Sequence, residues 1–242
     1  GNIVAATAQT NIAPVSGAFS LFAITKTNLL CLTGDNGGLK VVEDTTGYES
    51  QNNDLSFKEL GGITSTKDFL YISDTGNNVI LKYDIAGYSN NDSSLRFRRN
   101  YIELVGGFGG ATRQTKFNRP TFLASAGTQL AVFDSGNKNI KIFDVNLNFI
   151  TRISSVELGK ETFGAMGFDP DFKSLYVITY RDITTNKISV RTPFLYRFSG
   201  ANYRFSEKFT LNDKLGLNEK INSLTFSGTD SNYWYFGTDK TV

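Results

Sequence analysis

The feature that most constrains this chain is a hairpin pattern that occurs twice. Residues 70–84 read LYISDTGNNVILKYD, and residues 130–144 read LAVFDSGNKNIKIFD. Each copy consists of an alternating apolar strand, an Asp-x-Gly-Asn turn and a second alternating strand. One hairpin of this kind cannot bury its own apolar face, so such repeats must stack on one another. The duplication therefore predicts an all-β architecture built from packed hairpin units.

Three further strand-turn-strand units follow the same outline, at residues 30–42, 175–198 and 233–242. An apolar strand rich in glycine and small residues precedes each of the five units, at residues 19–24, 60–63, 120–124, 163–168 and 221–226. Small residues suit the inner strands of a β-propeller, where backbones crowd around a narrow axis. We therefore expect a β-propeller with five visible blades of up to four strands. A ring of six blades completed by further sequence is the alternative.

The segments around these units have their own expected roles. Residues 3–8 are expected to pair with the fifth blade and close the ring, and that blade is expected to turn at Gly237. Polar outer strands are expected at residues 96–98 and 203–205, where charge deters edge-to-edge pairing. The remaining connections are expected to be loops, at residues 43–54, 88–100, 106–116 and 182–187.

The third unit carries a family resemblance. Phe117-Asn118-Arg119-Pro120, the strand-turn-strand of residues 130–143 and the closing Asn148-Phe149-Ile150 resemble an NHL repeat of a β-propeller. The second unit matches from Gly61 to Asp84 but lacks the Phe-x-x-Pro entry, and the other units match in outline. The resemblance implies NHL-like blades. Propellers of this type bind proteins or RNA, and enzymatic relatives include lyases and calcium-dependent hydrolases with six blades.

Composition and charge limit the partners and the location expected for this chain. The 242 residues include 25 basic and 23 acidic side chains, so a net charge of +2 gives no general attraction to nucleic acid or to anionic membranes. No apolar run is long enough to predict a membrane span. The only methionine is Met166, and we expect residues 1–242 to form a single propeller domain cut from a longer chain. The asparagine-rich sequence also resembles repeat proteins of tailed-phage virions. This resemblance favours a virion or extracellular location over the cytoplasm.

The chain contains no histidine. Imidazole is the commonest proton-transfer group near neutral pH and a leading zinc ligand, so Ser-His and Cys-His catalysis and histidine-ligated metal sites are excluded. Cys31, among Leu29, Leu30 and Leu32, is expected to be a core thiol. Asp169 and Asp171 favour a turn over a calcium site, because calcium needs several more oxygen ligands. We predict no catalytic residue, no metal site and no cofactor.

Four turn residues repeat with the blades: Asp74, Asn77, Asp134 and Asn137. A short carboxylate at a strand end accepts hydrogen bonds from backbone N–H groups, and asparagine tolerates turn conformations. Repetition with the blades favours a structural role over a ring of carboxylates holding a cation.

The candidate binding residues lie in two connections. Phe108 lies between two glycine pairs, where a partner contact and internal packing are equally expected. Arg96, Arg98 and Arg99, with Phe97 and Tyr101, form a basic cluster with interleaved aromatic rings, to which Arg113 and Lys116 add. Such a cluster can hold single-stranded RNA, but a solvated outer strand is the favoured interpretation, and nucleic acid is not the expected partner. The glycine-rich segment 106–110 matches no phosphate-binding loop.

Together these observations favour a non-enzymatic structural or protein-interaction propeller, as a component of an assembly such as a phage particle. Its partner is expected to be another protein or a neighbouring subunit, contacted through residues 88–101, 106–116 and 181–193. A calcium-dependent hydrolase or lyase is the competing class, and an RNA-binding propeller is the third.

Overall fold

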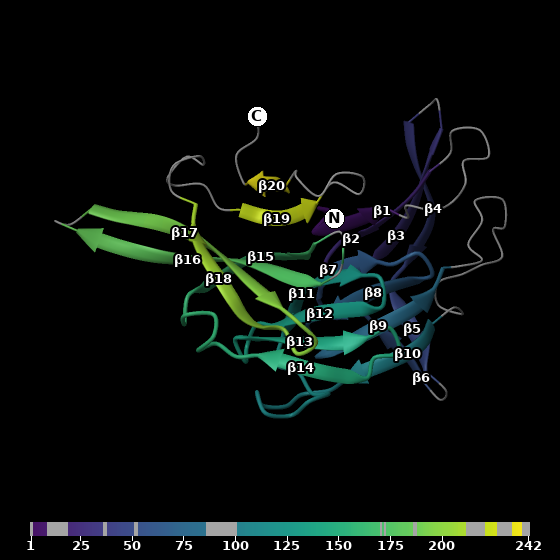
Figure 1. Cartoon of the computed structure of the whole chain (residues 1–242). Helices are drawn as coiled ribbons and strands as arrows, with labels where there is room; N and C mark the ends of the chain where they lie inside the picture. The colour runs from purple at the N-terminus through teal and green to yellow at the C-terminus, as the bar shows by residue number, and fades with distance from the viewer. Residues whose placement is uncertain are drawn as a thin grey trace. The chain divides into compact units, whose positions relative to one another are not determined.

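The computed structural model describes residues 2–8, 19–35, 38–50, 53–85, 101–169, 171, 173–185, 188–211, 221–226 and 234–238. Within these ranges every regular element is a β-strand (Figure 1). The prediction of an all-β chain is confirmed. The same ranges contain no helix long and apolar enough to span a membrane.

Most strands belong to four-stranded sheets. The first sheet has the order β1 (Ala5–Ala8), β2 (Phe19–Ile24), β3 (Leu29–Asp35), β4 (Gly38–Thr45). The second has the order β10 (Tyr101–Gly106), β9 (Val79–Asp84), β8 (Phe69–Asp74), β7 (Leu60–Ser65). The third is β11 (Pro120–Ala126), β12 (Gln129–Asp134), β13 (Asn139–Asp144), β14 (Phe149–Ile153), and the fourth is β15 (Thr162–Phe168), β16 (Ser174–Thr185), β17 (Ile188–Ser199), β18 (Arg204–Thr210). Two hairpins are separate, β5 (Gly47–Ser50) with β6 (Asn53–Ser56) and β19 (Ile221–Phe226) with β20 (Trp234–Thr238).

The chain divides into two compact units. The first comprises residues 1–138 and 144–149, and the second comprises residues 139–143 and 150–242. In the first unit β7 contacts both β1 and β11, so the innermost strands of successive sheets lie next to one another. Its core joins the first two sheets through buried Phe22, Ile24, Leu70 and Leu81, among others. The second unit places β15 against β19, with Ala165, Ile178 and Leu224 in its core.

Glycine on the innermost strands allows the close approach that small residues predict. A Cβ atom at Gly62 of β7 would collide with the backbone carbonyl of Thr121 on β11. At Gly61, a Cβ would meet the hydroxyl of Thr75 and the backbone of Thr121. Any larger residue would therefore push these two strands apart.

Three expectations about the blades are wrong. Residues 5–8 pair with β2 as the innermost strand of the first sheet, with Ala5 opposite Ile24, and do not extend the fifth blade. Residues 19–24 are consequently the second strand of that sheet. The strand expected at residues 96–98 lies outside the described residues and stays a prediction; the described outer strand of the second sheet is β10. Gly237 lies within β20, opposite Ser223, and is not a turn residue.

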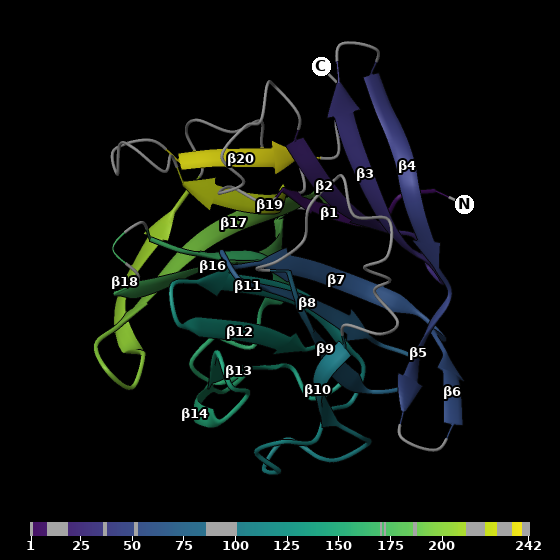
Figure 2. The same cartoon turned by 90° about the vertical axis from the view of Figure 1, so that its right-hand side faces the viewer.

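Two expected loops are strands. Residues 43–54 complete β4 and form most of the β5–β6 hairpin, which Figure 2 shows beyond the end of β4. Tyr48 and Phe57 explain this, because both are buried in the core and their ring centroids lie 5.9 Å apart. Of the connection expected at residues 182–187, residues 182–185 instead continue β16. Pro193 lies inside β17 opposite Tyr180.

The hairpin of β16 and β17 is longer than its sheet. β16 pairs with β15 only through residues 175–180, and β17 pairs with β18 only through residues 194–199. Residues 181–185 therefore pair with residues 188–192 alone. In Figure 1 the free end of this hairpin (green) extends beyond β15 and β18. The outer strand expected at residues 203–205 begins at Arg204, as β18.

Candidate functional site

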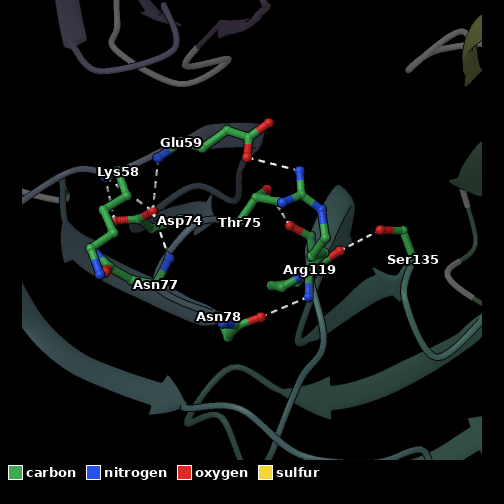
Figure 3. A network of polar contacts seen from close by, with 9 residues as sticks. Lys58, Glu59, Asp74, Thr75, Asn77, Asn78, Arg119 and Ser135 are labelled. Atoms are coloured by element: carbon green, nitrogen blue, oxygen red, sulfur yellow. Dashed lines mark hydrogen bonds and ion pairs between the residues drawn. The ribbon is translucent and has the colours of Figure 1, made fainter.

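The two Asp-x-Gly-Asn turns have the same local geometry. Asp74 is fully buried at the end of β8, and its carboxylate accepts hydrogen bonds from the backbone N–H groups of Lys58, Glu59 and Asn77. Asn77 Nδ2 donates to Asp74 Oδ2 over 2.7 Å (Figure 3). Asn78 follows with φ of 60°, a left-handed conformation that asparagine tolerates well.

The second copy repeats these contacts one sheet later. Asp134 is also fully buried and accepts a hydrogen bond from the backbone N–H of Asn118 over 2.7 Å. Asn137 Nδ2 donates to Asp134 Oδ2 over 2.7 Å. Lys138 has φ of 51°, in the position of Asn78. In both copies the aspartate links its own turn to the segment that enters the same sheet.

These turns also position a loop, residues 106–119, that we call the Phe108 loop. At its start, the backbone N–H of Gly107 donates to the carbonyl of Asn78 over 2.8 Å. At its end, the backbone N–H of Arg119 donates to Asn78 Oδ1 over 2.8 Å, and the Arg119 guanidinium bonds Glu59 Oε2 over 2.8 Å (Figure 3). Both ends of the loop are therefore attached to one turn.

Further contacts hold the interior of the Phe108 loop. The backbone N–H of Phe117 donates to the carbonyl of Gly107 over 3.0 Å, and that of Gly109 donates to the carbonyl of Phe117 over 2.9 Å. Asn137 Nδ2 donates to the carbonyl of Gly109 over 2.9 Å. Phe117, near the end of the loop, is fully buried. A connection between two sheets is thus held in one conformation by backbone bonds.

Phe108 is 75% exposed on this anchored loop. Arg113 and Lys116 are exposed as well, and Lys116 Nζ donates to the carbonyl of Gly106 over 2.7 Å. A Cβ atom at Gly109 would collide with Cβ of Lys116 and lie 3.7 Å from Cβ of Arg113. The aliphatic stems of both basic residues therefore lie close to the residue that follows Phe108. The structure brings together Phe108, Arg113 and Lys116, whereas Arg96, Arg98 and Arg99 lie outside the described residues.

A second polar cluster, which the sequence did not predict, surrounds Glu161 in the second unit. The Glu161 side chain is only 1% exposed. Its carboxylate accepts hydrogen bonds from the Thr179 hydroxyl, from Arg181 over 2.7 Å and from Lys208 Nζ over 3.0 Å. Lys208 Nζ also lies 3.9 Å from the ring centroid of Phe194. Glu161 directly precedes β15, while its partners Thr179 and Arg181 come from β16 and Lys208 comes from β18.

The surroundings of this Glu161 cluster stabilise the charged form of Lys208. Partial burial disfavours the charged form of Lys208, but hydrogen bonds to Tyr196 and Glu161 and the charge of Glu161 outweigh it and raise the pKa of Lys208. Burial raises the pKa of the Tyr196 hydroxyl. Two cations and the Thr179 hydroxyl contact the carboxylate, so Glu161 joins its own segment to β16 and β18.

Asp169, weighed above as a calcium ligand, directly follows β15. Asp169 Oδ1 accepts hydrogen bonds from the backbone N–H groups of Lys173 and Ser174, over 2.8 and 3.0 Å, as a turn residue does. Among the described residues, no three histidine, cysteine, aspartate or glutamate side chains are grouped to hold a metal ion. Cys31 is buried and forms no disulfide.

No family model matches this chain. No curated protein matches it either. Solved structures do match. A chain of the nidogen–laminin complex aligns with a TM-score of 0.53 and 18% identity, over 88% of this chain and 67% of that one. A chain of the apo, autoinhibited ctPRC2 complex aligns with a TM-score of 0.55 and 9% identity, over 93% of this chain and 46% of that one.

A third match is a putative 6-phosphogluconolactonase from Bacteroides uniformis, with a TM-score of 0.53 and 11% identity, over 93% of this chain and 61% of that one. This chain is therefore similar to β-propeller structures, and it spans about half to two thirds of the chains it matches. Identities this low concern the fold alone. The matched chains include a putative 6-phosphogluconolactonase and chains of two protein complexes.

Proposed function

We propose that this chain is a non-enzymatic protein-interaction module and that the Phe108 loop is its contact surface. The observation that supports this proposal most strongly is the exposure of Phe108, which is 75%. Phe108 lies on a loop whose backbone is held by hydrogen bonds at both ends and in its interior. Leaving a phenylalanine ring in water forgoes about 1.5–3 kcal/mol of burial free energy. A partner that covers the ring gains this free energy.

Rigidity supports the same proposal. An anchored loop loses little conformational entropy on binding, so more of the burial free energy appears as affinity. Aromatic and arginine side chains dominate the energetics of protein interfaces. Phe108 and Arg113 bring both kinds of side chain to one loop.

The finer assignment of the fold is also a proposal. We infer NHL-type blades from the Asp74–Asn77 and Asp134–Asn137 pairs, which repeat one contact pattern in successive sheets. A place in the virion of a tailed phage is a prediction from the style of the sequence alone. It suits a module that binds neighbouring subunits.

Site-specific photocrosslinking tests the proposed contact surface. The photoreactive residue p-benzoylphenylalanine replaces Phe108 in one variant and Val156 in a control variant, because Val156 is 69% exposed in the other unit. Each purified variant is irradiated alone and in an extract of the source cells or particles. We expect defined protein adducts at position 108 and only weak, scattered adducts at position 156.

Two outcomes would contradict the proposal. The absence of any adduct at position 108, in both samples, would mean that no protein covers the ring. Adducts that ribonuclease removes would assign the loop to RNA binding.

A further inference from the structure

We infer that Arg181 and Lys208 form a binding site for a small oxyanion, a carboxylate or a phosphate group, on the sheet of β16, β17 and β18. This site goes beyond the proposed function and does not involve the Phe108 loop. It follows from one buried carboxylate, that of Glu161, which contacts two partly exposed cations.

Glu161 holds the two cations close together. A single oxygen, Oε1, accepts from Arg181 Nη2 over 2.7 Å and from Lys208 Nζ over 3.0 Å. Because both bonds end on this one oxygen, the two nitrogens lie within about 6 Å of each other. Like charges at this distance repel, so an anion that contacts both nitrogens would be favourable.

The register of the sheet places both cations beside one aromatic ring. β16, β17 and β18 are neighbouring strands (Figure 1). Arg181 of β16 is opposite Thr192, and Lys208 of β18 is opposite Tyr196, so Phe194 lies between them on β17. Arg181 Cζ is 5.5 Å and Lys208 Nζ is 3.9 Å from the centroid of the Phe194 ring. Phe194 is itself buried, so its ring limits the positions that the two cations can take.

The cluster has one positive charge in excess among the described residues of this unit. Glu161 provides a single negative charge for Arg181 and Lys208. The other described carboxylates of residues 150–211 each have a different partner: Glu157 with Ser154, Asp169 with the N–H of Ser174, Asp171 with Lys173, Asp182 with Arg191, and Glu207 with Arg197. One bound oxyanion would supply the missing negative charge.

Both cations also have donors that can reach a ligand. The side chains of Arg181 and Lys208 are 51% and 30% exposed. A guanidinium carries five N–H donors and an ammonium carries three, whereas the described bond from Arg181 to Glu161 uses Nη2. Charge-assisted bonds to an oxyanion are about 2.7–2.9 Å long. An oxyanion at the exposed side of the pair can therefore bond Arg181 and Lys208 together.

Anion titration followed by NMR tests this site. Wild-type protein is titrated with sodium acetate and, separately, with sodium phosphate, while sodium chloride keeps the ionic strength constant. Arg181→Gln removes one cation of the site. Arg191→Gln is the matched control, because Arg191 lies on the same hairpin, is 45% exposed and contacts a carboxylate of its own, that of Asp182. Circular dichroism and thermal melting check that both variants are folded.

We expect acetate or phosphate to bind with a dissociation constant of about 1–10 mM and to shift the side-chain signals of Arg181 and Lys208 most strongly. Arg181→Gln should weaken this binding by at least about tenfold, whereas Arg191→Gln should change it by less than about twofold. Tighter binding of acetate assigns the site to a carboxylate ligand, and tighter binding of phosphate assigns it to a phosphorylated ligand.

Unshifted signals of Arg181 and Lys208 at about 100 mM of either anion would overturn the inference. So would shifts of equal size at all exposed basic side chains, or an equal loss of binding in the two variants. The titration of wild-type protein needs no variant, so it decides the matter even if Arg181→Gln does not fold. Crosslinks from position 108 neither require nor exclude this site, so the proposed function and this inference fail separately.

Discussion

The side-chain amide of Asn137 donates a 2.7 Å hydrogen bond to the buried carboxylate of Asp134. Asn77 and Asp74 form the same bond at the same distance one sheet earlier. In each sheet the aspartate also accepts from a backbone N–H of the entering segment, that of Asn118 or of Lys58. The Asp–Asn pair is therefore a contact that repeats from sheet to sheet. Asn137 of the second pair also donates to the carbonyl of Gly109 in the Phe108 loop.

Removing the carboxylate of Asp134 should destabilise the first unit. Asp134→Ala leaves the N–H of Asn118 and the amide of Asn137 without their acceptor, which should lower the free energy of unfolding by about 2–4 kcal/mol. Urea unfolding followed by fluorescence measures the loss. Asp171→Ala is the matched control, because Asp171 is exposed and lies 3.9 Å from Lys173, and it should change the free energy by less than about 0.5 kcal/mol.

Glu161→Gln tests the buried ion cluster of the second unit. The variant keeps the shape of the side chain but removes the charge that faces Arg181 and Lys208, so we expect a loss of about 2–4 kcal/mol in unfolding free energy. Glu207→Gln changes an exposed carboxylate that lies 3.7 Å from Arg197 and should have almost no effect. Equal losses in the two variants would show that the cluster contributes no more than a surface ion pair.

Gly62→Ala tests the close approach of β7 and β11. The added methyl group would collide with the carbonyl of Thr121, so the variant should lose about 2 kcal/mol or more of stability. At Gly110 a Cβ atom would meet nothing within 4 Å, and Gly110→Ala should be neutral or slightly stabilising. Thermal melting of both variants measures the difference. A Gly62→Ala protein as stable as wild type would contradict the packing of these innermost strands.

Alkaline pH should destabilise the second unit through Tyr203. Burial, with a smaller contribution from the charge of Asp169, raises the pKa of Tyr203 to about 12 from its ordinary 10.0. The stability that the neutral phenol provides is therefore complete below pH 10 and is lost as the pH rises through 12. One pKa unit corresponds to about 1.4 kcal/mol, so the rise of about two units corresponds to at most about 3 kcal/mol. Tyr203→Phe should flatten the stability curve between pH 10 and 12, as measured by urea unfolding at fixed pH.

The duplicated hairpin was enough to predict the repeat of the fold. Its alternating strands became β8–β9 and β12–β13, and the glycine-rich segments ahead of the later units became the innermost strands β7, β11, β15 and β19. These segments could be recognised because local periodicity and turn chemistry determine them.

Other elements depend on contacts that are distant in sequence. Residues 43–54 look polar and aperiodic, and only the burial of Tyr48 and Phe57 in a core shared with the second sheet makes them strands. Pro193 lies opposite Tyr180 inside β17, and the hairpin continues past it. Residues 5–8 could pair with either neighbour by pattern alone, and tertiary packing selected β2.

The two candidate sites also differ in how far the sequence predicts them. Phe108, between two glycine pairs, was visible as an unusual aromatic residue, but its exposure depends on Asn78, Phe117 and Asn137, which hold the loop around it. Glu161 had no sequence signal, because its partners come from two strands, β16 and β18, between residues 174 and 210. Only the register of the fourth sheet brings them together.

The most direct test of the account is the solvent exposure of the Phe108 ring, read from 4-fluorophenylalanine placed at position 108. Fluorine relaxation by a soluble paramagnetic agent is measured first in dilute protein, then in concentrated protein and in the presence of any crosslinked partner. We predict strong relaxation in dilute protein and a marked decrease when a protein covers the ring. Weak relaxation in dilute protein, or strong relaxation under every condition, would contradict the claim that Phe108 is held outward for a partner.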